Sequence, residues 1–159
     1  TQIALMHNGE IILGVSSGTM MDELAWAEKG QGAWLNGKPL KISRIDDPRR
    51  AAVSTGNLKS LAGSEGWARL GEVVEHADRI RGYGDFYHYH LLAAGKIEAV
   101  IESDVNILDI AALSIIVTEA GGVFTNLNGE RVDLDIRSVL AANPSLHAKY
   151  LERLRGYVT

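Results

Sequence analysis

The sequence contains no cysteine, and this absence removes several kinds of site at once. Without thiolates the chain has no zinc–thiolate centre, iron–sulfur cluster, disulfide framework or catalytic thiol. Such a composition is compatible with a reducing cytoplasm, where we expect the protein to reside. At 159 residues, one compact core should stabilise the chain without disulfides or a structural metal.

Positive charge and long apolar runs are also scarce. Sixteen basic residues against twenty acidic ones give a net charge of −4, so the chain has no general basic field for nucleic acid or an anionic membrane. The longest apolar stretches, such as residues 110–117 and 139–142, are far shorter than the roughly 20 residues of a membrane span. We therefore expect a soluble protein that binds neither nucleic acid nor membranes.

The order of predicted elements indicates a layered α/β fold. Two β-prone runs, 3–6 and 10–16, flank an Asn-Gly turn and predict a hairpin. A polar break at 46–48 separates this β-rich part from a part in which strands and helices alternate. We expect further strands at 23–27, 51–55, 79–83, 97–102, 123–127 and 139–142, and helices at 66–76, 86–94, 109–120 and from Pro144, with Asn143 as its cap.

Three acidic residues stand at predicted element boundaries. Asp85 and Asp109 each open a helix, and Glu102 ends a strand, so all three could project from one edge of the sheet, where α/β folds place ligands. Carboxylate oxygens suit Mg²⁺, and a helix N-terminus suits a phosphate. The simpler interpretation is that both aspartates cap their helices and that Glu102 is a solvated strand end.

Other candidate groups give weaker signals. His88 and His90 lie two residues apart on a predicted helix, so they point to different faces and are interpreted as ordinary surface or half-buried histidines. His7, His76 and His147 receive no role. No serine lies in a Gly-x-Ser-x-Gly elbow, and the Gly-x-Gly at 30–32 lacks the third glycine of a dinucleotide fingerprint, so it predicts a turn. We expect Trp26, Trp34 and Trp67 in the core or in a pocket.

Several segments, taken in order, resemble the inositol monophosphatase family of Mg²⁺-dependent phosphatases. The segments 14–40, 108–112 and 117–123 resemble its middle region and second signature. The run Gly-Asp-Phe-Tyr at 84–87, with Tyr89 and the Leu-Leu-Ala at 91–93, is similar to histidinol-phosphate phosphatases within that family. The resemblance implies a layered α-β sandwich of the sugar-phosphatase type, of which residues 1–159 would be about the C-terminal two thirds of a single domain.

The resemblance also implies a reaction and roles for the acidic residues. A metal-activated water would attack the phosphate monoester directly, which for histidinol phosphate yields histidinol in histidine biosynthesis. Asp109 matches a metal-ligating catalytic aspartate, Glu102 matches the acid that binds the polar groups of the substrate, and Asp85 would bind the amine or imidazole of histidinol. The implied cofactor is Mg²⁺, and the implied assembly is a homodimer.

Two departures from the family pattern leave alternatives open. Leu108 stands where the family usually has Trp, and the Asp-Pro-Ile-Asp-Gly-Thr signature that supplies most metal ligands is not in the sequence. Because Thr1 begins directly in a predicted strand, we expect the natural protein to extend upstream and to carry those ligands there. The alternatives are an inositol or other sugar phosphatase, a non-catalytic fragment or binding module, and a plain structural α/β domain.

Overall fold

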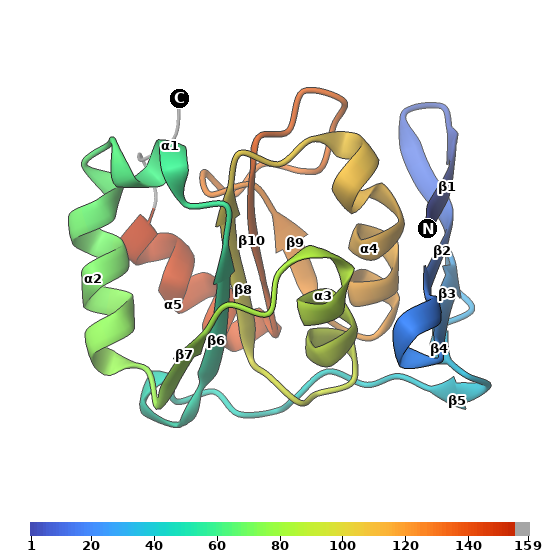
Figure 1. Ribbon diagram of the computed structural model, residues 1–159, viewed down its shortest axis with the longest axis horizontal. Coiled ribbons are helices and arrows are strands. Elements are labelled where there is room, and N and C mark those ends of the chain that lie inside the picture. The colour runs from blue at the N-terminus through green and yellow to red at the C-terminus, as the bar shows by residue number, and fades with distance from the viewer. Residues whose placement is uncertain (155–159) are drawn as a thin grey trace.

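The computed structural model describes residues 1–154. They form two sheets with helices between them and on one outer side (Figure 1). The first sheet is an antiparallel meander whose strands follow chain order: β1 (Gln2–His7), β2 (Glu10–Gly18), β3 (Glu23–Glu28), β4 (Ala33–Leu35) and β5 (Lys38–Pro39). The predicted hairpin is confirmed, since β1 pairs with β2 across Asn8 and Gly9, both at positive φ.

The second sheet is mixed. Its spatial order is β7 (Arg79–Arg81), β6 (Ala52–Gly56), β8 (Ala99–Ser103), β10 (Ser138–Ala142) and β9 (Val123–Thr125). Strand β6 runs parallel to β7 and β8, whereas β10 is antiparallel to β8 and β9. The carboxyl ends of β6 and β8 therefore lie side by side, which places Gly56 opposite Glu102.

Two helices, α3 (Asp85–Ala93) and α4 (Ile107–Glu119), fill the space between the sheets (Figure 1). Helix α4 contacts β1, β2 and β3 on one side and β9 on the other. Because it is covered on both sides, its residues 110 and 112–117 are all buried. The apolar run 110–117 is therefore a helix enclosed between two sheets.

The remaining helices cover the other face of the second sheet (Figure 1). They are α1 (Lys59–Ala62), α2 (Gly66–His76) and α5 (Pro144–Leu154), and 3₁₀ turns lie at Thr19–Met21 and Pro48–Arg50. Leu61, Leu70 and Leu146 from these helices pack with β-strand residues in a second apolar cluster. The predicted cap of α5 is confirmed, since Asn143 Oδ1 accepts the Leu146 N–H at 3.0 Å.

The outer face of the first sheet stays exposed in the part of the chain that the structure describes. Ile3 pairs with Val15, Val15 with Trp26, and Trp26 with Trp34, so these side chains share one face. Ile3 is 61% exposed, and Trp26 stacks on Trp34 with ring centroids 5.9 Å apart. The prediction of core or pocket tryptophans is wrong for Trp26 and Trp67, because the first lies on this open sheet face and the second on the solvent side of α2.

The Gly-x-Gly at 30–32 is the turn that the sequence predicts. Gly30 and Gly32 have positive φ and donate their N–H groups to the two oxygens of Glu119, each at 2.9 Å. Glu119 is the last residue of α4, so the turn fastens the first sheet to the enclosed helix.

Among residues 1–154, no helix combines the length and the apolar character that crossing a membrane requires.

Candidate functional site

The three predicted acidic residues line one cavity of about 300 Å³. It lies where the N-terminal ends of α3 and α4 meet the end of β8. Its lining residues are Gln2, Asn57, Asp85, Phe86, Tyr89, Glu102, Val105, Leu108, Asp109 and Ile110. Asp85, Glu102 and Asp109 therefore lie together around one cavity, and the roles expected of them stay predictions.

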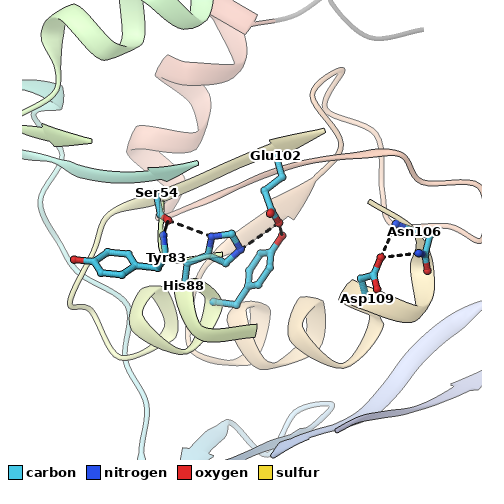
Figure 2. A network of polar contacts seen from close by, with 7 residues as sticks. Ser54, Tyr83, His88, Glu102, Asn106 and Asp109 are labelled. Carbon is cyan, nitrogen blue, oxygen red and sulfur yellow. Dashed lines mark hydrogen bonds and ion pairs between the residues drawn. The ribbon is translucent and has the colours of Figure 1, made fainter. Parts of the chain in front are cut away.

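Asp109 belongs to a capping box at the start of α4. Asn106 is the N-cap, and its Oδ1 accepts the Leu108 N–H at 2.9 Å. In return Asp109 Oδ2 accepts the Asn106 backbone N–H at 3.2 Å and the Asn106 Nδ2 amide at 2.6 Å (Figure 2). Both bonds reach Oδ2, and no hydrogen bond from residues 1–154 reaches Oδ1. Asp109 can thus cap the helix and still offer one oxygen to a ligand.

Asp85 does not cap its helix. It is the first residue of α3 and has a φ of +47°, a conformation that aspartate tolerates better than most residues. The N-cap position is held by Gly84, and no side chain makes a capping hydrogen bond there. The capping interpretation is wrong for Asp85, and its carboxylate lines the cavity without a hydrogen-bond partner among the described residues.

Glu102 is a buried strand residue, not a solvated strand end. It is 3% exposed, and β8 continues to Ser103. Its Oε2 accepts hydrogen bonds from Tyr89 OH at 2.5 Å and from His88 Nε2 at 3.1 Å. Burial and the neighbouring Glu102 carboxylate raise the pKa of Tyr89 well above its usual value, so the phenol keeps the proton that it donates.

Both histidines of α3 are buried, which corrects their interpretation as surface or half-buried groups. His88 lies between Glu102 and Ser54, whose Oγ is 3.2 Å from Nδ1 (Figure 2). His90 lies on the opposite side, with Nε2 2.6 Å from Ser16 Oγ and Nδ1 2.7 Å from Glu23 Oε2. Burial lowers the pKa of His90, although Glu23 counteracts the shift. The two rings do face different sheets, as their spacing predicts.

No Lys, Arg or His side chain lines the cavity among the described residues, and the basic group beside its carboxylates is the His88 ring at Glu102, which carries a charge only when it is protonated. A cation is the ligand that such a site favours. The free Oδ1 of Asp109 has the hard oxygen chemistry of a Mg²⁺ ligand. However, residues 1–154 contain no group of three His, Asp, Glu or Cys side chains that could hold a metal ion. The residues present therefore fit one ligand of a metal site rather than a complete one.

The two sheets, the enclosed helices and the acidic cavity at the helix starts define a layered α/β protein. A family model described as the inositol monophosphatase family matches residues 1–159. The chain belongs to this family.

Curated relatives of the chain include histidinol-phosphatases and inositol monophosphatases. It is 34% identical to a histidinol-phosphatase of Mycobacterium tuberculosis, over 97% of this chain and 61% of that protein. It is also 34% identical to an inositol-1-monophosphatase of Caulobacter vibrioides, over 97% of this chain and 62% of that protein. The chain thus spans about three fifths of the length of these relatives.

Solved structures have the same fold. The extragenic suppressor protein suhB of Bartonella henselae superposes with a TM-score of 0.88 at 28% identity, covering 98% of this chain and 61% of that one. A Thermotoga maritima IMPase gives a TM-score of 0.85 at 27% identity, with 96% and 59% covered. The predicted layered α/β fold of the inositol monophosphatase type is therefore confirmed.

Sequence reasoning missed two residues that contact Glu102. The spacing of His88 from His90 predicts only that the two rings point to different faces of the helix. That argument considers neighbours on the helix and no other part of the chain. A signal does exist in the sequence, since polar side chains at positions 88 and 89 of an enclosed helix each require a buried partner.

Proposed function

We propose that the full-length protein containing this chain is a Mg²⁺-dependent phosphomonoesterase that hydrolyses histidinol phosphate to histidinol. The observation that carries the proposal is the cavity in which Asp85, Glu102 and Asp109 meet, with no Lys, Arg or His side chain in its lining among the described residues. An anionic phosphate would be repelled by these carboxylates unless a cation accompanies it. Relatives named histidinol-phosphatase and inositol-1-monophosphatase both support the hydrolysis of phosphate esters.

Asp109 is the residue of this chain that we propose as a metal ligand, through its free Oδ1. The other ligands are proposed to lie in the part of the family fold that this chain does not span. A bound Mg²⁺ would neutralise charge on the phosphate and activate the attacking water. The residues of this chain would orient the metal ligand and the phosphate. The Asn106 amide holds the Asp109 carboxylate in place, and the N-terminus of α4 would add a partial positive charge beside the phosphate.

Glu102 and Asp85 are proposed to bind the alcohol part of the substrate. Histidinol carries an ammonium group and an imidazole, and charge-assisted hydrogen bonds to carboxylates are about twice as strong as neutral ones. Two carboxylates in addition to a metal-ligating aspartate therefore favour a cationic alcohol over a neutral polyol. This charge balance is why we place histidinol phosphate before inositol phosphate.

Inositol phosphate, or another sugar phosphate, is the second candidate. The specific observation in its favour is the inositol-1-monophosphatase relative, whose identity equals that of the histidinol-phosphatase relative. A non-catalytic binding module is the candidate of another class, supported by the lack of a three-ligand metal cluster within residues 1–154.

The test is phosphate release by the full-length protein from histidinol phosphate and from inositol 1-phosphate, each across a Mg²⁺ titration and after chelation. We expect a preference for histidinol phosphate of about tenfold or more, since one charge-assisted contact contributes about that much. A preference for inositol 1-phosphate would replace the proposed substrate. No Mg²⁺-dependent release from either would favour the binding module.

The same proposal includes a cytoplasmic homodimer that acts in histidine biosynthesis. Light scattering on the full-length protein tests the dimer directly. A monomer at micromolar concentration would contradict that part of the proposal and leave the reaction unaffected.

A further inference from the structure

Two consecutive side chains of α3 reach the same oxygen of Glu102. His88 Nε2 lies 3.1 Å and Tyr89 OH 2.5 Å from Oε2, and the three residues are 0%, 1% and 3% exposed (Figure 2 shows His88 and Glu102). Consecutive helical residues point about 100° apart, so they meet on one atom only when that atom lies between their directions. The contact therefore depends on how β8 is placed against α3.

The network around Glu102 continues through His88 to Ser54 and the Tyr83 backbone. The Tyr83 backbone N–H donates to Ser54 Oγ at 3.3 Å, and the Ser54 hydroxyl is 3.2 Å from His88 Nδ1. If Nδ1 accepts from Ser54, the neutral imidazole carries its proton on Nε2 and donates it to the carboxylate. Each member then has a partner of the correct kind, and Glu102 receives two donors on one oxygen.

The other oxygen of Glu102 stays open to the cavity. No hydrogen bond from residues 1–154 reaches Oε1. This oxygen is not fully buried, and Glu102 lines the cavity. Opposite it, β6 has Gly56, and a Cβ at that position would overlap Oε1. Gly56 lies in strand β6 and not in the left-handed region, so its backbone does not require glycine, and the missing side chain leaves space beside Oε1.

We propose that His88 and Tyr89 are positioning residues that hold Glu102 by Oε2 and thereby present Oε1 to the alcohol part of the substrate. An oxygen held in this way selects alcohols that carry a hydroxyl or ammonium donor over phosphate esters whose leaving group has none. This inference rests on the proposed function, because it assumes that the cavity receives the alcohol portion of a phosphate monoester.

The experiment compares kcat/KM of the full-length protein for histidinol phosphate with that for p-nitrophenyl phosphate, whose leaving group offers no donor. Tyr89→Phe removes one hydrogen bond to Oε2 and keeps the ring that stacks on Phe124. We expect the ratio of the two kcat/KM values to fall about tenfold, mainly through KM for histidinol phosphate. Tyr87→Phe is the matched control, because no hydrogen bond of the Tyr87 hydroxyl is present among residues 1–154 and the ratio should stay unchanged.

A second pair of variants separates positioning from packing. His88→Leu should lower the ratio as Tyr89→Phe does, and His88→Gln, which keeps a donor, should recover most of the loss. An unchanged ratio in Tyr89→Phe, or equal losses in His88→Leu and His88→Gln, would overturn the proposal.

A measurement of stability tests the network without relying on activity. Tyr89→Phe should lower the denaturation midpoint of the wild-type protein but leave it equal or raise it in a Glu102→Met background, where the phenol has lost its acceptor. Equal shifts in both backgrounds would refute the network. If the protein hydrolyses inositol 1-phosphate instead of histidinol phosphate, the substrate proposal fails, and the kcat/KM ratio measured with inositol 1-phosphate still tests the positioning role. If it hydrolyses neither ester, the denaturation experiment decides whether His88 and Tyr89 hold Glu102.

Discussion

Asp109→Asn distinguishes a helix-capping residue from a metal ligand, because the structure gives Asp109 both opportunities on different oxygens. Oδ2 accepts two hydrogen bonds from Asn106, no hydrogen bond from residues 1–154 reaches Oδ1, and Asp109 lines the cavity. Asparagine has nearly the same size and keeps one acceptor oxygen. The substitution therefore changes the charge at the cavity while it preserves most of the contact with the N-cap.

The expected effects on stability and on activity differ in size. Replacing a charged acceptor with a neutral one, at the positive end of a helix, should cost about 1 kcal/mol of unfolding free energy. For a protein of more than about 150 residues this corresponds to roughly 2–4 °C in Tm. Loss of one electrostatic contact at the reacting phosphate should lower kcat by about 10²–10³, or roughly 3–4 kcal/mol.

The assay measures kcat across a Mg²⁺ titration together with thermal melting, both in the full-length protein. Asp104→Asn is the control: it removes the same charge from the loop that precedes α4, and Asp104 accepts the Ser60 N–H at 2.8 Å outside the cavity. That hydrogen bond holds the pKa of Asp104 below its usual value, so it is also a carboxylate at neutral pH. A folded Asp109→Asn protein with wild-type kcat at every Mg²⁺ concentration would refute the ligand role and leave Asp109 as a cap.

Burial lowers the pKa of His147 to about 4, whereas the ordinary value, expected in the unfolded chain, is about 6.5. The unfolded state therefore binds more protons, and stability should fall as the pH drops from about 6.5 toward 4. Urea denaturation should show this fall, and His147→Gln should reduce it. Gly14→Ala would place a Cβ 2.5 Å from the Ala112 carbonyl oxygen and should destabilise the protein by about 1–3 kcal/mol, whereas Gly71→Ala, in open space on a helix, should stabilise it by about 0.5–1 kcal/mol. Glu119→Gln keeps one acceptor oxygen, leaves one of the two glycine N–H groups without an acceptor and should cost about 1–2 kcal/mol in the same denaturation assay. A stabilising Gly14→Ala, a destabilising Gly71→Ala, or no loss for Glu119→Gln would contradict the packing described around these three residues.

Elements with strong local signals were predicted well. The helix at 66–76 was predicted to the residue, and the N-cap of α5 and the first hairpin were predicted from Asn143 and from an Asn-Gly pair. Capping and turn formation involve atoms within about four residues, so a sequence pattern contains the whole interaction. The predicted strand at 97–102 instead begins at residue 99, because its ends are set by pairing with β6 and β10.

The interpretation of the buried polar residues failed for the opposite reason. His90 is paired with Ser16, 74 positions away, and His88 with Ser54, 34 positions away. Nothing near these histidines in the sequence contains those partners. Trp26 is an apolar example of the same difficulty. Its side chain predicts burial, but no element of residues 1–154 covers the outer face of its sheet.

The sequence by itself determined the class of fold, the succession of strands and helices, and the three carboxylates at their boundaries, because each follows from local periodicity, turn chemistry and charge. Tertiary structure alone decided which oxygens of those carboxylates are free. Asn106 takes one oxygen of Asp109, and His88 with Tyr89 takes one oxygen of Glu102. Hydrogen bonds act over about 3 Å, so the choice depends on how α3, α4 and β8 pack together, and that packing is a property of the whole fold.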